Sequence, residues 1–517
     1  MNIGKAKIQI ENAVRAYLTR DEDGEYVIPV EKQRPVLLIG PPGIGKTAVM
    51  EQIAADLGIG ILAYSMTHHT RQSAIGLPFI SHKTYDGVEY DVTEYTMSEI
   101  IASIYDLMEE TGVREGILFL DEINCVSETL APLMLQLLQY KVFGRHRIPD
   151  GWIITAAGNP PEYNDSVREF DIVTLDRLKK IDVEPDYEAW KKYAAGAGVH
   201  PAVTAFLDAR RNRFYSVETT VSGRRIVTPR GWEDLSGMLY LYERNGIDAD
   251  KDLMIQYLQD PVTASEFAVY YDLYRKYQSE YPAAEILSGS CREEIRARAR
   301  DAGFDEVYSL IGLLLEAVKD DARRFMAGYH ALDRLKRYIK EYRERANDLR
   351  ETAADKSAGM PRISPELSPS ESMAKIADEV RQAGTAGARA GSISRGERQI
   401  LKNTAEMLSV LAAAAAAASD YESSYDIIRS KYAEMAAVRR EEASQLRARM
   451  SALISFADEC WGDGREMTLI VTELTAEPDC VDFIYRFGCD EYFSHNGSLL
   501  TGERQREIDA QLAGLDI

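Results

Sequence analysis

Apolar residues in the first 185 positions form two kinds of pattern. Continuous runs with the length of buried strands are found at 36–39, 59–65, 117–120 and 152–157. Apolar residues that recur every three or four positions, as in amphipathic helices, are found at 4–19, 47–57, 97–110 and 128–139. A capping box, Thr96 to Glu99, marks the start of the third helix. Strands that alternate with helices predict an α/β core, in which a parallel sheet carries helices on both faces.

Helical patterns dominate the rest of the chain. Apolar stripes predict long helices at 307–318, 332–342 and 421–435. We expect residues 300–350 to pair with 400–457 as an antiparallel helical hairpin or coiled coil. Segments rich in small residues at 358–372 and 383–396 predict linkers or mobile loops, and a β-like run at 467–474 predicts a strand.

The composition narrows the class of protein. The chain has 61 Lys and Arg against 83 Asp and Glu, a formal net charge of −22, which repels polyanions over most of the surface. Nucleic acid and anionic membranes are therefore disfavoured as main partners. Five cysteines in 517 residues do not suggest a disulfide framework. The N-terminus lacks the apolar core of a signal peptide, and no stretch approaches the roughly 20 apolar residues that span a bilayer, so we expect a cytoplasmic protein without membrane insertion.

The first strand leads into a segment with the spacing of a phosphate-binding loop, Gly40-Pro41-Pro42-Gly43-Ile44-Gly45-Lys46-Thr47. Its glycines let successive backbone N–H groups face phosphate oxygens. Lys46 supplies a positive charge at the β- and γ-phosphates, and the Thr47 hydroxyl can ligate Mg²⁺. The helix that follows, with Ala48 in its first turn, directs the positive end of its dipole at the same anion. This segment predicts a nucleoside triphosphate site.

Two later strands end in residues that suit the chemistry of such a site. The strand at 117–120 ends in Asp121 and Glu122, at the edge of a parallel sheet where the phosphates would lie. We expect Asp121 to hold Mg²⁺, usually through its waters, and Glu122 to orient or deprotonate the attacking water. The strand at 152–157 leads to Asn159, whose amide can hydrogen-bond the γ-phosphate or the lytic water.

With the loop at 40–47, Asp121-Glu122-Ile123-Asn124 and Ala157-Gly158-Asn159-Pro160 in this order, residues 1–280 resemble the AAA+ ATPases, most closely the MoxR-like branch. The resemblance implies ATP and Mg²⁺ as cofactors. Leu175-Asp176-Arg177 is similar to the segment that carries the arginine finger in that family, which implies this role for Arg177. Because Leu178 stands where the family usually has Phe, Arg168 is the alternative finger. Thr228-Pro229-Arg230 is similar to the sensor 2 motif, which implies that Arg230 contacts the nucleotide from a small helical lid.

An arginine finger that serves a neighbouring subunit requires an oligomer, and the resemblance implies a hexameric ring. Similar proteins carry an extra helical insertion that faces the ring axis, for which residues 71–80 or 85–96 would serve. The expected domains are an AAA+ nucleotide-binding α/β domain at 1–184, a helical lid at 185–280, a long-helix region at 281–460 with a flexible linker at about 358–396, and a small cap at 461–517.

The leading functional hypothesis is a Mg²⁺-dependent ATPase that remodels or activates a partner protein, in the manner of MoxR-like chaperones. By the same resemblance, that partner is often a protein with a von Willebrand factor A domain. The second hypothesis is a nucleotide-gated scaffold, in which ATP controls assembly and hydrolysis is slow. A nucleic-acid motor is disfavoured by the acidic charge and by the absence of an aromatic-and-basic binding signature.

Two groups of potential metal ligands fit no standard zinc spacing. His68 and His69 have no third ligand nearby, so we interpret them as loop residues. In the C-terminal tail, Cys480 and Cys489 are followed by one histidine, His495, and we interpret them as part of a packed cap.

Overall fold

The chain forms two compact units. The computed structural model describes residues 1–495 apart from 69–73, 75, 144, 164–166, 169, 221–222, 355–366 and 419. The first unit comprises the described residues of 1–190, 228–231 and 383–398, and the second comprises those of 191–227, 232–382 and 399–495. The four domains expected from the sequence stay a prediction. No helix in the described ranges is both long and apolar enough to cross a membrane.

A five-stranded parallel sheet forms the centre of the first unit. Its strands, in spatial order, are β2 (Gly60–Ser65), β5 (Gly116–Asp121), β8 (Trp152–Gly158), β1 (Val36–Ile39) and β9 (Lys179–Asp182). Every neighbouring pair is parallel. The carboxyl ends of β1, β5 and β8 therefore meet at one edge of the sheet, as the sequence predicts.

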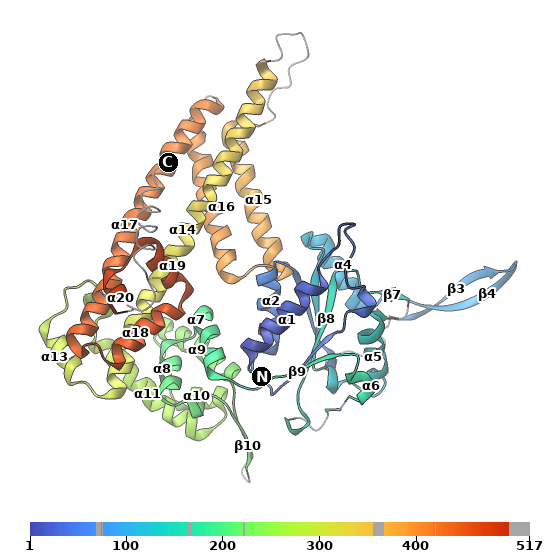
Figure 1. The fold of residues 1–517 in the computed structure, drawn as a ribbon, viewed down its shortest axis with the longest axis horizontal. Coiled ribbons are helices and arrows are strands. Elements are labelled where there is room, and N and C mark those ends of the chain that lie inside the picture. The colour runs from blue at the N-terminus through green and yellow to red at the C-terminus, as the bar shows by residue number, and fades with distance from the viewer. Residues whose placement is uncertain are drawn as a thin grey trace. The chain divides into compact units, whose positions relative to one another are not determined.

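Helices cover both faces of this sheet (Figure 1). On one face, α4 (Glu99–Thr111) and α5 (Ala131–Tyr140) pack in a single core with the strand residues Leu37, Leu118 and Ile154. The alternate residues, such as Leu38 and Phe119, are also buried and point to the opposite face. There α2 (Lys46–Leu57) contacts β2 and β5, and α1 (Ile3–Tyr17) packs against α2.

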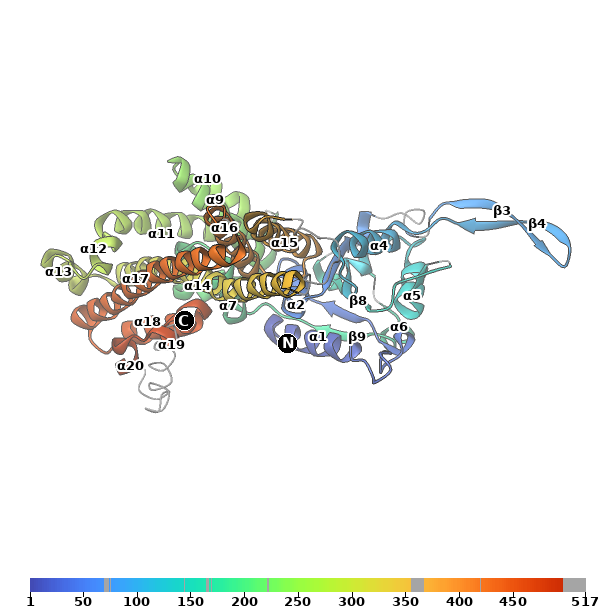
Figure 2. The same ribbon diagram turned by 90° about the horizontal axis from the view of Figure 1, so that it is seen from above.

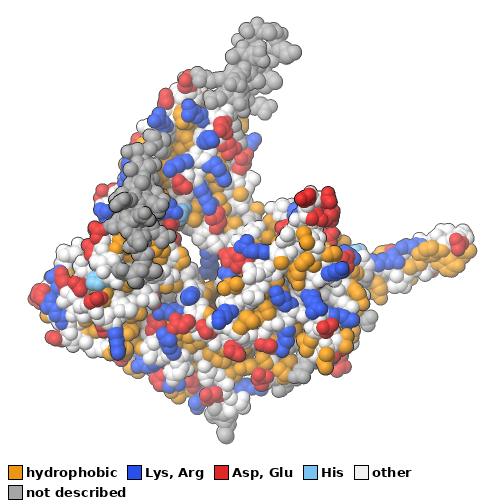
Figure 3. Space-filling view, in the orientation of Figure 1, with side chains coloured by type: hydrophobic (Ala, Val, Ile, Leu, Met, Phe, Trp, Pro, Cys, Tyr) orange, Lys and Arg blue, Asp and Glu red, His pale blue; other side chains and the backbone are white. Residues whose placement is uncertain are grey.

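A long β-hairpin occupies the segments in which a helical insertion is expected from the resemblance. Strands β3 (Pro78–Tyr85) and β4 (Val88–Tyr95) pair in antiparallel register along their whole length and project from the first unit (Figures 1 and 2). Asp86 and Gly87 connect them with positive φ at both positions, the geometry of a two-residue hairpin turn. The helical expectation is therefore wrong for 78–80 and for 85–95, whereas Ala74 is helical and 71–73 and 75 lie outside the described residues. Hydrophobic side chains are exposed along the hairpin (Figure 3).

The second unit is largely helical. Its helices, some of which begin or end in the first unit, are α7 (Tyr187–Ala197), α8 (Pro201–Ala209), α9 (Pro229–Asn245), α10 (Lys251–Leu258), α11 (Pro261–Glu280), α12 (Ala283–Leu287), α13 (Glu293–Asp301), α14 (Phe304–Ala354), α15 (Pro369–Ala390), α16 (Arg395–Ala415), α17 (Tyr421–Trp461), α18 (Arg465–Ala476), α19 (Pro478–Phe487) and α20 (Asp490–His495). The remaining short strands of the chain are β6 (Val142–Phe143), β7 (His146–Arg147), β10 (Ser216–Thr220) and β11 (Gly223–Val227).

The expected pairing of residues 300–350 with 400–457 is confirmed. Helices α14 and α17 lie side by side (Figure 1). One core joins Leu314 of α14 to Leu446 and Leu453 of α17, with further contacts from α18, α19 and α20. A second core joins the later turns of α14 to α15, α16 and the first turns of α17.

Three local expectations are corrected by the structure. The β-like run at 467–474 lies in α18, where the buried residues Met467, Ile470 and Leu474 follow helical spacing, so tertiary burial overrides the β-propensity of its branched side chains. The expected linker at 383–396 instead contains the end of α15 and the start of α16. Of the linker expected at 358–372, residues 369–372 lie in α15 and 358–366 lie outside the described residues. Ser98, and not Thr96, caps α4, because the Ser98 hydroxyl accepts the Ile100 N–H at 3.2 Å.

The tip between α15 and α16 belongs to the first unit and packs against β2 and α4. Gly391 has φ +68°, and a Cβ there would lie 2.5 Å from Cγ2 of Ile61 in β2. Arg389 forms an ion pair with Glu110 of α4, with 2.7 Å between Nη2 and Oε2. A segment distant in sequence therefore covers the sheet edge at β2.

Candidate functional site

The loop between β1 and α2 is shaped by its glycines. Gly43 and Gly45 have φ of +75° and +92°, a region that disfavours other residues. Space is also restricted, because a Cβ on Gly40 would lie 2.8 Å from the Val183 carbonyl oxygen, and one on Gly43 would lie 2.7 Å from Cβ of Thr228. Gly45 is the N-cap of α2 and offers no side-chain acceptor to the first turn. The backbone N–H groups there can donate hydrogen bonds to an anion, whose binding the helix dipole also favours.

Lys46 is buried at the first position of α2. Its Nζ donates to the carbonyl oxygens of Gly40 at 2.7 Å and Pro41 at 2.8 Å, and to Oδ1 of Asn159 at 2.9 Å. Burial lowers the pKa of Lys46 to about 8, an effect that the charges of Asp121 and Glu122 oppose. The ammonium group therefore lies between the phosphate loop and the end of β8.

Thr47 and Asp121 meet at the same edge of the sheet. The Thr47 hydroxyl donates to Oδ2 of Asp121 at 3.0 Å, and Oδ1 of Asp121 accepts the Glu122 N–H at 2.9 Å. Hydroxyl and carboxylate oxygens are the hard donors that Mg²⁺ prefers, and this ion takes few protein ligands besides phosphates and waters. The pair fits a Mg²⁺ ion bound with a nucleotide. In the described part of the chain, no group of three or more His, Cys, Asp or Glu is placed to hold a metal on its own.

Glu122 has an unusual backbone conformation and a restrained side chain. Its φ is +56°, which is uncommon for a residue with a side chain. One carboxylate oxygen, Oε2, accepts hydrogen bonds from the hydroxyls of Ser65 and Thr67, each at 3.0 Å. Sequence reasoning missed both hydroxyl residues. The available signal was that Ser65 ends a strand, and this strand pairs with β5 so that Ser65 lies opposite Asp121.

A second asparagine supports Asn159. Asn124 is buried, and its Nδ2 donates to the backbone carbonyl of Asn159 at 2.8 Å. A Cβ at Gly158 would lie 2.4 Å from Oδ1 of Asn124, so a side chain at 158 would displace this contact. Asn124 is the last residue of the Asp121–Asn124 motif, and the sequence alone predicts no role for it. The structure assigns it to positioning the end of β8.

The two arginines implied by the resemblance are placed differently. Arg230 begins α9, its backbone N–H donates to the Gly43 carbonyl at 3.2 Å, and its charge lowers the pKa of Lys46. Arg177 follows α6 (Ile172–Leu175), has an exposed side chain, and its charge acts on Asp171 and not on the phosphate loop. Arg168, the alternative finger, forms an ion pair with Glu128 at 2.8 Å.

Of the paired histidines, His69 and the side chain of His68 lie outside the described residues. Cys480 and Cys489 are buried in the helical core with Phe483 and Ile484.

Residues 35–177 match the sequence profile of the AAA domain of the dynein-related subfamily. The match spans the phosphate loop, Asp121, Glu122 and Asn159 and ends at Arg177, and it supports an AAA+ ATPase that binds a nucleotide with a divalent metal ion. A search among curated proteins gives no significant match.

Several solved structures share limited similarity with the chain. Two point mutants of RuvB from Thermotoga maritima are 18% and 19% identical, each with a TM-score of 0.28, and cover 54% of this chain and 77% and 76% of their own. PCH-2 from C. elegans is 14% identical with a TM-score of 0.23, covering 49% of this chain and 59% of its own. Scores this low carry no argument about the site.

Proposed function

We propose that the protein is a Mg²⁺-dependent AAA+ ATPase of MoxR type, which couples ATP binding and hydrolysis in an oligomeric ring to the remodelling or activation of a partner protein. The observation that carries the proposal is the convergence of Lys46, Thr47, Asp121, Glu122 and Asn159 at one edge of the parallel sheet. A backbone anion cradle, a lysine, a metal-binding pair and a general base are the parts that phosphoryl-transfer sites in P-loop NTPases combine.

Each side chain has a separate part in the proposed reaction. The N–H groups of 40–47 and the Lys46 ammonium bind the β- and γ-phosphates, so the three hydrogen bonds that Lys46 now makes would be exchanged for phosphate oxygens. Thr47 and Asp121 would hold Mg²⁺, which neutralises phosphate charge when bound. Glu122 accepts a proton from the attacking water or orients it, and Asn159 positions that water.

The arginines extend the proposal to an assembly. Arg230 is close enough to act on Lys46 within one chain, which supports the sensor 2 role. Arg177 is exposed, next to the exposed apolar residues Ile172 and Val173. This arrangement supports a finger that reaches the nucleotide of a neighbouring copy in a ring, for which a hexamer is the proposed stoichiometry. A protein with a von Willebrand factor A domain is the proposed partner, on resemblance alone.

A second candidate function is favoured by the contacts of Glu122. Oε2 of its carboxylate accepts the hydroxyls of Ser65 and Thr67, and a base restrained in this way favours slow hydrolysis. The protein would then be a nucleotide-gated scaffold, in which ATP binding controls assembly and hydrolysis resets it.

The substitution Glu122→Gln tests the proposal. Removal of the base keeps the size of the side chain, so we expect ATP affinity to be retained and turnover to fall by about 10²- to 10⁴-fold. Steady-state ATP hydrolysis and equilibrium ATP binding measure the two quantities. Glu115→Gln is the matched control, because Glu115 precedes the same strand and pairs with Arg20 outside the site.

Normal turnover in Glu122→Gln would exclude Glu122 as the base. Light scattering, together with an assay of partner activation on the same samples, separates the two candidate functions. A variant that still assembles with ATP and still activates its partner supports the scaffold, whereas loss of activation with intact assembly supports remodelling by turnover.

A further inference from the structure

A cavity of about 520 Å³ lies within the second unit and has no part in the proposed ATPase site. Its walls come from the start of α8, from α9, from the end of α11, from α12 and from α14. The volume falls in the range of small-molecule pockets, which is about 300–1,000 Å³. We call it the tyrosine cavity, after Tyr240, Tyr274 and Tyr281 in its lining.

Aromatic rings form much of the wall. His200 stacks beside Tyr240 with 4.7 Å between ring centroids and beside Tyr274 with 5.8 Å. Nδ1 of His200 accepts the Ala202 N–H at 3.1 Å, and Nε2 of His200 lies 3.3 Å from Oε1 of Glu243. Tyrosine faces attract cations through the ring quadrupole.

The charged side chains of the lining are mostly acidic. Three carboxylates, Glu243, Glu316 and Asp320, line the cavity with one guanidinium, Arg323. Arg323 lies 3.2 Å from Glu316 and 3.5 Å from Asp320. Arg275 and Arg324, which are outside the lining, pair with Glu243 at 3.3 Å and with Asp320 at 3.6 Å. The lining itself therefore presents three carboxylates and one guanidinium to the cavity.

Tyr274 supplies an independent sign of a ligand. Its side chain is only 1% exposed, yet among the described residues its hydroxyl has no hydrogen-bond partner. Burial, together with the nearby charge of Glu243, raises the pKa of Tyr274 well above its usual value, so the hydroxyl stays protonated. The hydroxyl is not fully enclosed by protein and reaches the cavity wall, where a bound hydrogen-bond donor or acceptor can pair with it.

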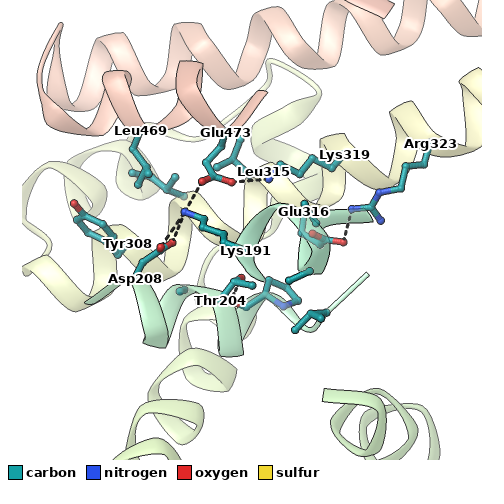
Figure 4. A pocket seen from close by; sticks show the side chains of 17 residues that line it. Lys191, Thr204, Asp208, Tyr308, Leu315, Glu316, Lys319, Arg323, Leu469 and Glu473 are labelled. Carbon is teal, nitrogen blue, oxygen red and sulfur yellow. Dashed lines mark hydrogen bonds and ion pairs between the residues drawn. The ribbon is translucent and has the colours of Figure 1, made fainter. Parts of the chain in front are cut away.

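A neighbouring cavity is smaller, and charged side chains in its lining pair with one another (Figure 4). Its volume is only about 60 Å³, and its charges are paired with one another. Lys191 lies 2.9 Å from Asp208 and 2.6 Å from Glu473, which also binds Lys319 at 2.8 Å. That space has no excess charge and no room for an organic molecule.

We propose that the tyrosine cavity binds an organic cation with a primary ammonium group. The ammonium donates hydrogen bonds to the Tyr274 hydroxyl and to the carboxylate of Glu316, and its carbon chain packs on the ring of Tyr240. A neutral molecule of the same shape gains the packing but not the charge pairing.

Isothermal titration calorimetry of the full-length protein tests this proposal with three probes of equal chain length: hexylamine, 1-hexanol and hexanoate. Near neutral pH they present a positive, a neutral and a negative head group. We expect hexylamine to bind with one-to-one stoichiometry and at least about tenfold more tightly than hexanol, with no binding of hexanoate. Equal affinity for hexylamine and hexanol, weak binding at many sites, or no binding of hexylamine up to millimolar concentration would each overturn the proposal.

Matched variants locate the binding. Tyr274→Phe keeps the ring and should weaken hexylamine binding about tenfold while sparing hexanol, and Glu316→Gln should act in the same way. Glu285→Gln is the control for the carboxylate, because both side chains pair with an arginine and are 25% and 26% exposed. Tyr240→Ala tests whether the carbon chain packs on the Tyr240 ring and should weaken the binding of both hexylamine and hexanol. Tyr105→Ala is its control, because the two tyrosines are 39% and 41% exposed. Unchanged hexylamine affinity in both Tyr274→Phe and Glu316→Gln overturns the proposal.

Discussion

The phosphate loop and the tyrosine cavity are proposed to bind opposite charges by different means. The loop is one stretch of eight residues, whose backbone N–H groups and Lys46 would face an anion. The cavity is assembled from side chains between residues 198 and 323, on several helices, and presents carboxylates and aromatic faces. An anion site built from backbone depends on φ values and glycines, whereas a cation site built from side chains depends on how separate helices pack. The first tolerates little change in local sequence, and the second tolerates little change in tertiary structure.

The largest expected effect concerns whether one chain supplies every residue of the anion site. All lining residues of the tyrosine cavity come from one chain. Arg177→Ala should lower ATP turnover by about 10³-fold, because an arginine finger neutralises charge that develops on the transferred phosphoryl group. Hexylamine binding should not change. Steady-state hydrolysis at several protein concentrations, with particle size from light scattering, measures the effect.

A mixing experiment provides the control for Arg177. An Arg177→Ala chain keeps its phosphate loop and a Lys46→Ala chain keeps its finger, so mixed assemblies should regain activity that neither variant has alone. Arg168→Ala, which breaks the ion pair with Glu128, should have little effect. Turnover that is independent of protein concentration, or a mixture as inactive as its parts, contradicts a finger supplied by a neighbour.

Lys46→Ala separates the two sites directly. Loss of the ammonium should weaken ATP binding by about 100-fold, because a buried charge-assisted contact to phosphate is removed. Hexylamine affinity should stay unaltered, because Lys46 lies in the first unit and the tyrosine cavity lies in the second. Fluorescence titration with a labelled ATP analogue measures the first quantity and calorimetry the second. Lys141→Ala is the control, since Lys141 is also buried in the first unit and burial also lowers its pKa to about 8, but it binds Gln33. A parallel loss of hexylamine binding in Lys46→Ala contradicts the independence of the sites.

The smallest expected effect is the dependence of the anion site on pH. Burial lowers the pKa of Lys46 from 10.5 to about 8, so raising the pH from about 7 to about 9 should weaken ATP binding about tenfold. Lys46→Arg keeps its charge and should show a smaller change. Between about pH 8 and 10.5 the unfolded chain binds more protons at this lysine than the folded chain, so this group increases the free energy of unfolding as pH rises. Identical pH profiles for the wild type and Lys46→Arg would contradict the assignment.

The position of the residues of the proposed anion site was predictable because its information is local. A phosphate loop is a fixed spacing in one segment, and the parallel order of strands then brings Asp121, Glu122 and Asn159 to the same edge. The helical pairing of 300–350 with 400–457 also followed from periodicity, because a continuous apolar stripe must be buried against another helix.

Other features depended on contacts that the sequence does not mark. The hydroxyls of Ser65 and Thr67 reach Glu122 only because β2 pairs with β5 in this register. The lining of the tyrosine cavity draws on residues up to 125 positions apart, from 198 to 323, none with a diagnostic spacing. The run at 467–474 misled because β-branched composition and helical spacing of apolar residues compete, and burial decides between them.

The helical insertion was expected from resemblance, although the local sequence pointed elsewhere. Asp86-Gly87 between two runs containing alternating polar and apolar residues is a strong hairpin signal, and the structure contains that hairpin. Local turn chemistry was a better guide there than the family comparison.

The positive φ of Glu122 has a consequence for how this domain can change over evolutionary time. A left-handed backbone at a residue with a side chain costs of order 1–3 kcal/mol relative to glycine, and the hydrogen bond from its N–H to Asp121 helps to maintain it. Selection for stability alone would therefore favour glycine at position 122, which has no carboxylate. The chain retains the less stable residue where the proposed chemistry requires one, an example of stability traded for activity.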